Sequence, residues 1–166
     1  PLVSTPPNPG TPAEAEIAAL GVGRRIYITA DFGTSWPDQP DLPTGSGSAF
    51  SMVFASATRL YVGTTIGRVF RLDDAGAAGW TVTRIDNAVG GPLPIAGLVS
   101  DLAIDWSDAT LNSIFLSFGG VGDFRVVEVD LHHGLHGVGV GLECGARQVA
   151  VARPQHVDRA EQVHRV

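Results

Sequence analysis

The stretch TADFGTSW is the first place in this sequence where side chains could do chemistry. It follows the strand-like run RRIYI and sets the carboxylate of Asp31 between the hydroxyl residues Thr29 and Ser35. Such a group could be catalytic, bind a cation, or close a turn. Asp can accept hydrogen bonds from the backbone N–H groups that follow it, and Gly33 can adopt a positive φ. We therefore expect a hairpin turn, with the Asp31 carboxylate bonded to backbone N–H groups and Trp36 largely buried between sheets.

Three further aspartates, Asp101, Asp105 and Asp108, could form a cation cluster. In a strand, Asp101 and Asp105 would share one face, because successive side chains alternate. The opposite face would then hold an apolar row of Leu102, Ile104 and Trp106. A solvated sheet edge is the favoured interpretation, and no metal site is assigned.

Glycoside hydrolysis is the enzyme chemistry that the carboxylates could support, since it needs two of them at a fixed separation. Recognition of a substrate carboxylate would need arginines, whose planar head groups bind it in a bidentate manner. The arginines available for this are Arg24, Arg25, Arg68 and Arg71. The sequence does not show which groups converge, and no catalytic residue is assigned.

All five histidines lie in the last 35 residues, together with the single cysteine, Cys144: His132, His133, His136, His156 and His164. On a helix, His132 and His136 would share a face and could bind a metal. The neighbouring glycines make a helix there costly, so a flexible Gly/His segment is favoured over a metal site. One cysteine cannot form a disulfide within the chain.

Composition narrows the class of protein. The 166 residues are 44% hydrophobic and 17% charged, which is typical of a folded domain. The net charge is −6 and every basic residue is an arginine, so a nucleic-acid-binding face is not expected. No apolar run is long enough to span a membrane as a helix. The chain begins at Pro1 without a signal-peptide pattern, and we expect it to be a segment of a larger protein.

Three regions differ in pattern. Residues 1–16 are rich in proline and read as an extended linker or loop. Residues 17–131 form short runs rich in Val, Ile, Phe, Tyr and Thr, separated by Gly, Asp and Pro, which predicts an all-β fold. The expected strands are 24–29, 48–55, 59–65, 67–73, 80–85, 99–106, 112–118 and 123–131.

These strands recur as a repeat. An offset of 43 places Asp31 on Asp74 and Tyr27 on Phe70, and an offset of 54 places Val62 on Leu116. A repeat of 43–57 residues with four strands describes one blade of a β-propeller. We expect residues 46–86 to form a four-stranded antiparallel sheet, and residues 99–130 to give three strands of a sheet packed on it.

The stretch at 29–36 resembles the Asp-box of BNR-repeat β-propellers, which reads Ser/Thr-x-Asp-x-Gly-x-Thr/Ser-Trp. The matching residues are Thr29, Asp31, Gly33, Ser35 and Trp36. A degenerate second box, LDDAGAAGW, has one extra residue and keeps Asp74, Gly76 and Trp80. The resemblance covers about residues 20–130 and implies a partial propeller, because this length of repeat does not close a ring.

The resemblance implies a structural role for the boxes and no cofactor. The family contains sialidases, xyloglucan-degrading glycosidases, sortilin-type receptors and photosystem assembly factors. We therefore expect a non-catalytic binding or scaffold segment of a larger, extracytoplasmic propeller protein, with a carbohydrate or protein ligand and the remaining blades as partners. The alternative is part of a glycoside hydrolase whose catalytic residues lie mostly outside this segment. The sialidase signature Phe-Arg-Ile-Pro is absent, and Phe124-Arg125-Val126-Val127 is a distant echo of it.

Residues 132–166 depart from the repeat. The alignment places Asp130 on Asp73, yet no third box ending in Trp follows, and histidine rises from none to five. One hypothesis is a shifted reading frame, in which case residues 135–166 should contribute few buried contacts. The other is a diverged tail that adds a strand or helix to cover the open edge of the sheet.

Overall fold

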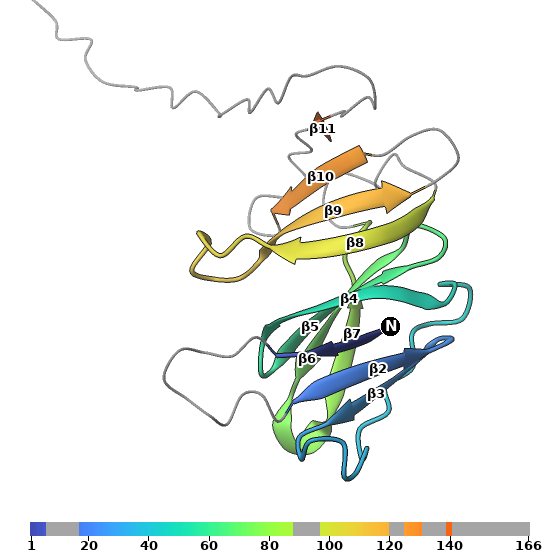
Figure 1. Ribbon diagram of the computed structural model, residues 1–166, viewed down its shortest axis with the longest axis vertical. Helices are drawn as coiled ribbons and strands as arrows, with labels where there is room; N and C mark the ends of the chain where they lie inside the picture. Colours follow the sequence, from blue (N-terminus) through green and yellow to red (C-terminus); the bar gives the residue numbers. More distant parts are fainter. Residues whose placement is uncertain (6–16, 88–96, 120–124, 131–138, 141–166) are drawn as a thin grey trace, which may run out of the picture.

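The computed structural model describes residues 1–5, 17–87 and 97–119, and the backbone of 125–130 and 139–140. The described strands form three antiparallel sheets that follow one another along the chain (Figure 1). The first sheet holds β1 (Leu2–Ser4), β2 (Ala18–Val22) and β3 (Arg25–Thr29). The second holds β4 (Ala49–Ser56), β5 (Arg59–Thr64), β6 (Val69–Asp74) and β7 (Trp80–Arg84). The third holds β8 (Leu98–Ile104), β9 (Ser113–Gly119), β10 (Arg125–Asp130) and β11 (Gly139–Val140).

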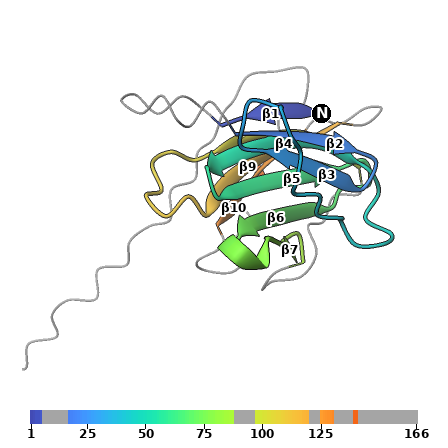
Figure 2. The same cartoon turned by 90° about the horizontal axis from the view of Figure 1, so that it is seen from below.

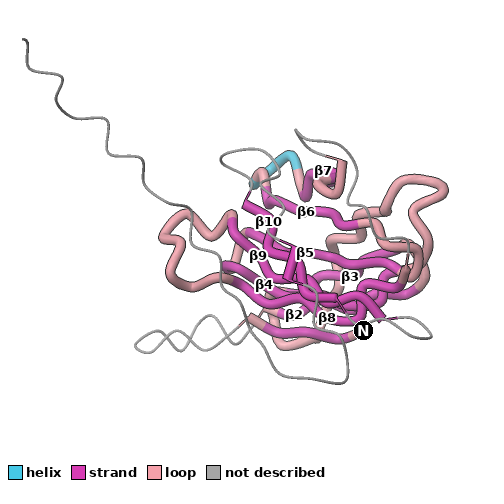
Figure 3. The backbone as a smooth tube through the Cα atoms, turned by 90° about the horizontal axis from the view of Figure 1, so that it is seen from above, coloured by secondary structure: helices cyan, strands magenta, loops and turns pink. Residues whose placement is uncertain are grey.

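The all-β prediction is confirmed, and so is the division of residues 46–130 into two sheets. The second sheet has the expected order β4-β5-β6-β7. In the described part of the chain the helical structure is one short 3₁₀ turn, Gly76–Ala78, shown in cyan in Figure 3.

Three short strands were not expected from the sequence: β1, β2 and β11. Leu2–Ser4 lies within the predicted linker, yet it forms β1 and pairs with β2 through Leu2↔Leu20. Gly139–Val140 lies in the atypical tail and pairs with β10 as β11. A strand in the tail fits the hypothesis of a diverged edge. The rest of residues 132–166, with the histidines and Cys144, lies outside the described residues, as do residues 6–16.

The chain returns beside β3 after the Asp31 loop. The N–H groups of Ile26 and Ile28 donate to the carbonyl oxygens of Pro40 and Asp38, at 3.0 and 2.9 Å. Proline supplies no N–H to a ladder, so this edge segment pairs at isolated positions and not as a regular strand. The loop at 30–37 therefore connects β3 to residues 38–41, which form an irregular fourth segment at the edge of the first sheet.

The second sheet is buried on both faces, because each face packs on a neighbouring sheet (Figures 1 and 2). Leu60 and Val62 lie in a core shared with the first sheet, while Tyr61 between them lies in a core shared with the third. The expected face-to-face packing of these sheets is confirmed. Ile114, Leu116 and Phe118 also share a buried face, as predicted.

The same cross-strand row occurs in all three sheets. The registers give Leu2↔Leu20↔Tyr27 in the first sheet and Met52↔Val62↔Phe70 in the second. In the third sheet the corresponding row is Leu102↔Leu116↔Val127. These rows place Tyr27, Phe70 and Val127, and also Val62 and Leu116, at the equivalent positions that the sequence repeat predicted.

Glycines allow the sheets to approach closely. A Cβ on Gly63 would lie 2.4 Å from Cγ1 of Val99 and 2.5 Å from Oγ of Ser51. The Ser51 hydroxyl donates to the Val99 carbonyl oxygen at 2.9 Å, which fixes β4 against β8. A Cβ on Gly21, in the first sheet, would lie 2.9 Å from Cβ of Ala49. Both sheet–sheet contacts thus depend on a strand position without a side chain.

Candidate functional site

The Asp31 loop closes on itself. Oδ1 of Asp31 accepts from the Ser35 N–H at 2.9 Å and from the Thr29 hydroxyl at 2.7 Å, and Oδ2 accepts from the Ser35 hydroxyl at 2.6 Å. The Thr29 oxygen in turn accepts from the Gly33 N–H at 2.9 Å. The predicted bond from a backbone N–H to this carboxylate is confirmed. Its partners are local, which is what a turn requires.

These bonds stabilise the ionised carboxylate. The hydroxyl and N–H of Ser35, followed by the hydroxyl of Thr29, lower the pKa of Asp31 to about 2. A general acid needs the opposite shift, because it must hold its proton near neutral pH. The Asp31 carboxylate is therefore a hydrogen-bond acceptor that the loop uses for its own structure.

Backbone geometry in the loop follows the expectation only in part. Gly33 has a φ of 82°, and Phe32 has a φ of 57° with a side chain that is 70% exposed. Trp36 is largely but not completely buried, and it belongs to neither of the two described cores, so the expected position between sheets is not found. Its ring folds back onto its own loop, where a Cβ on Gly33 would be 3.5 Å from Cζ2 of Trp36. The loop lies beyond the end of β3, so the ring does not reach the layer between the sheets.

The second, degenerate box forms a looser turn. Asp74 accepts from the Gly76 N–H at 2.8 Å, and the Gly79 N–H donates to the Gly76 carbonyl oxygen at 2.8 Å. Trp80 begins β7 opposite Asp74 and packs, half-buried, on the core between the first and second sheets. The extra residue is accommodated by the 3₁₀ turn, and Ala78 stands where the first box has a hydroxyl.

The aspartates between β8 and β9 close two successive turns. Asp105 accepts from the N–H and hydroxyl of Ser107 at 2.8 and 2.6 Å. Asp108 accepts from the Thr110 side chain and from backbone N–H groups, including that of Ser113 at 2.9 Å. The bonds from Thr110, in the side chain first and then the backbone, hold the pKa of Asp108 far below its usual range. Within the described ranges, no group of His, Cys, Asp and Glu is placed to hold a metal ion.

Trp106 does not continue the apolar row of β8. The strand ends at Ile104, and the turn at Asp105 carries the indole out to solvent, where it is 59% exposed. Leu102 and Ile104 are buried as expected. The prediction that Trp106 shares their face is wrong.

The arginines proposed for a substrate carboxylate do not converge. Arg25 binds Asp41 with two bonds of 3.1 Å, and Arg24 donates to the Leu42 carbonyl oxygen at 2.7 Å. In the second sheet, Arg68 pairs with Asp86 at 3.5 Å and Arg71 pairs with Asp73 at 2.7 Å. Arg68 and Arg71 bind different aspartates, because Arg68 precedes β6 and Arg71 lies within it.

Asp86 shows how tightly one of these carboxylates is held. Burial opposes its ionisation, but the hydrogen bonds from Arg84 and from the Val69 N–H outweigh that effect and lower its pKa. The Arg84 guanidinium donates to both carboxylate oxygens, at 2.9 and 2.7 Å. This bidentate pair lies at the end of β7, and the Val69 N–H, which donates to Asp86 at 3.1 Å, joins it to the start of β6.

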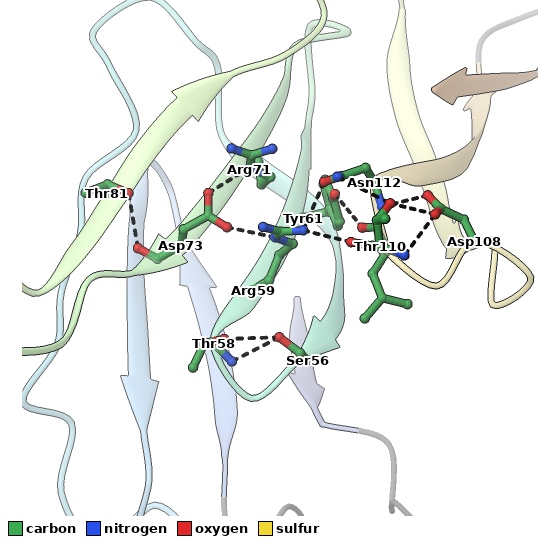
Figure 4. A network of polar contacts seen from close by, with 11 residues as sticks. Ser56, Thr58, Arg59, Tyr61, Arg71, Asp73, Thr81, Asp108, Thr110 and Asn112 are labelled. Carbon is green, nitrogen blue, oxygen red and sulfur yellow. Dashed lines mark hydrogen bonds and ion pairs between the residues drawn. The ribbon is translucent and has the colours of Figure 1, made fainter. Parts of the chain in front are cut away.

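A polar network joins the second sheet to the β8–β9 loop (Figure 4). Asp73 accepts from Arg59 and from Arg71, each at 2.7 Å. Arg59 also reaches the loop, donating to the Asn112 side-chain oxygen at 2.9 Å and to the Thr110 carbonyl oxygen at 3.2 Å.

Tyr61 adds a buried contact to this network. Its hydroxyl donates to the Leu111 carbonyl oxygen at 2.8 Å, and burial raises its pKa. This network was not predicted from the sequence, because its partners lie about fifty residues apart. A signal was present in the β5–β6 hairpin, whose register opposes Arg59 to Asp73 and Tyr61 to Arg71.

The polar groups of these described loops therefore hold elements together. The carboxylates of Asp31, Asp41, Asp86 and Asp108 have lowered pKa values, which favours the ionised acceptor over a proton donor. Comparisons with protein families, curated proteins and solved structures found no match. Among the described residues, no helix has the length and apolar character needed to cross a membrane.

Proposed function

We propose that this chain is a non-catalytic binding or scaffold segment of a BNR-repeat β-propeller, with each of its three sheets acting as one blade. The repeated cross-strand row is the observation that carries this proposal. Rows of the same register in successive antiparallel sheets, stacked face to face, are what a repeat architecture of this kind requires.

The loops support the non-catalytic part of the proposal. In an Asp-box with a structural role, the aspartate should bind its own turn, and Asp31 does so through both carboxylate oxygens. Arg59, Arg68, Arg71 and Arg84 bind aspartates of this chain, so their charge is already compensated. A glycoside hydrolase with its catalytic residues outside this segment is the competing proposal, and these pairings give it less support.

Sheets outside this chain would complete the ring, since propellers of known architecture have four to eight blades. Following the family resemblance, the ligand is a carbohydrate or a protein, and the larger protein acts outside the cytoplasm.

The experiment measures binding and turnover on the same glycans. The purified chain is applied to immobilised xyloglucan and sialylated glycans, and the released sugar is quantified alongside retention. We expect no sugar release, with or without retention, and the same behaviour for the variant Asp73→Asn. Sugar release that disappears in Asp73→Asn or Asp31→Asn would show that the segment is catalytic.

A further inference from the structure

Each internal contact between sheets joins two distinct faces. The forward face of a sheet packs on the next sheet along the chain, and the backward face packs on the preceding one. In the second sheet the forward face contains the row Val53↔Tyr61↔Arg71. Its backward face contains the row Met52↔Val62↔Phe70. Alternation of side chains along the strands separates the two rows.

Among the described residues, no other sheet packs on the backward face of the first sheet. Leu2, Leu20 and Tyr27 occupy the positions that Met52, Val62 and Phe70 occupy in the second sheet. In the second sheet this row packs on the first sheet, with Val62 and Phe70 fully buried. In the first sheet Leu2 is 70% exposed, while Leu20 and Tyr27 are partly exposed.

Among the described residues, no other sheet packs on the forward face of the third sheet. Its row Ala103↔Phe115↔Glu128 corresponds to Val53↔Tyr61↔Arg71, which packs on the third sheet. Ala103 and Phe115 are exposed, and they line a shallow, mainly apolar hollow of about 190 Å³. This face lies at the opposite end of the stack from the first sheet (Figure 1).

We infer that these two faces bind each other between two copies of the chain. One molecule carries both halves of a contact that it already makes twice internally, so a second copy is the occupant whose surface fits each half. A two-fold arrangement would place the first sheet of each copy on the third sheet of the other, with residue i contacting j and j contacting i. Two copies of three sheets give six, which is within the range of closed propellers.

This inference rests on the proposed function in one respect, because it treats each sheet as one blade of a closed propeller. It adds that a second copy supplies the sheets that complete that ring. Exposed apolar side chains such as Leu2 and Phe115, one at each end of the stack, are the contacts that a second copy would bury.

The test is the mass in solution of the 166-residue chain and of charged variants, by analytical ultracentrifugation over a dilution series. We expect twice the 17.3 kDa mass of one chain. Leu2→Glu and Phe115→Glu each place a charge on one of the two faces, and each should weaken the dimer at least tenfold. Ile66→Glu is the matched control, because Ile66 is 48% exposed in the β5–β6 turn, outside both faces.

Mixing the two variants separates this arrangement from other dimers. In either variant alone, every contact between a first and a third sheet contains a glutamate. In a mixed pair, the first sheet of Phe115→Glu can bind the third sheet of Leu2→Glu with both faces intact, while the other contact carries both glutamates, so one contact is kept where each single variant loses both. We expect the mixture to dimerise more tightly than either variant alone.

A monomeric parent chain, a mass above two copies, or a mixture no tighter than its components would overturn the inference. If the chain is a monomer that keeps its circular dichroism spectrum and unfolds cooperatively, it is folded, and only the proposed dimer is overturned. The proposed propeller segment would then stand, with its remaining sheets supplied by other chain segments.

Discussion

Asp31 obtains its hydrogen-bond partners from residues within four positions of itself, so its contribution is to the loop. Replacing it by alanine leaves the Ser35 N–H without its acceptor. We expect Asp31→Ala to lower the midpoint of thermal unfolding by about 2–4 °C, a shift typical of one lost local interaction in a chain of this size. Asp74→Ala is the matched control, since Asp74 accepts a described bond from Gly76 alone. A larger shift for Asp74→Ala would contradict this account of the two boxes.

The lowered pKa of Asp31 also predicts how stability depends on pH. Its carboxyl titrates near 2 in the folded chain, compared with 3.8 for an unperturbed group. Because the folded pKa is the lower one, the stabilisation is fully present above pH 4 and is lost as pH falls toward 2. We expect the difference in thermal midpoint between the parent chain and Asp31→Asn to shrink over that interval. A difference that is constant from pH 6 to pH 2 would show that ionisation of Asp31 does not matter.

For single residues, the sequence predicted hydrogen bonds within a loop more accurately than it predicted which side chains are buried. The carboxylate of Asp31 and the positive φ of Gly33 follow from residue types a few positions apart. The exposure of Trp106 depends on where β8 ends, and the sequence pattern placed that end at residue 106, beyond Ile104. An aromatic residue just past a strand can leave the buried face within one turn.

At the scale of elements, the approach of β5 to β8 depends on Gly63. A Cβ at this position would overlap Val99 and Ser51, and neither is the free end of a long side chain. We expect Gly63→Ala to reduce the free energy of unfolding by about 1–3 kcal/mol, the usual cost of overpacking a core. Chemical denaturation monitored by fluorescence gives this value.

Gly97→Ala is the control for that measurement. A Cβ on Gly97 would be 3.5 Å from the Gly119 carbonyl oxygen, an ordinary contact. If the two variants lost the same stability, the effect would come from glycine itself and not from the contact between the sheets.

The strands β4 to β10 of the second and third sheets were predictable because β-branched and aromatic residues alternate between turn residues, whereas β11 lies in the atypical tail. β2 was missed because Ala18–Val22 has few such residues, and β1 because three residues beside a proline-rich stretch carry little pattern. The Arg59 network was missed for a different reason. Its partners meet only when the third sheet packs on the second, and one sequence does not show that packing.

At the scale of the whole molecule, the third sheet is held by an apolar core and by a polar clamp at one end of that core. Tyr61 belongs to both, since its ring is fully buried and its hydroxyl reaches the β8–β9 loop at Leu111. Tyr61→Phe keeps the ring and removes the hydrogen bond, so the third sheet should detach more easily from the other two. We expect a loss of about 0.5–1.5 kcal/mol, the net value of one such bond.

Native-state hydrogen exchange can locate that loss. Amide protection in β8 and β9 should fall in Tyr61→Phe, while protection in β2 and β3 should stay the same, since the first sheet packs on the opposite face of the second. Thr81→Ala removes a bond to the Asp73 carbonyl oxygen that lies entirely within the second sheet, so it should leave β8 and β9 unchanged. Equal loss of protection in all three sheets would mean that the stack opens as one cooperative unit, with the clamp at Tyr61 stabilising the whole stack.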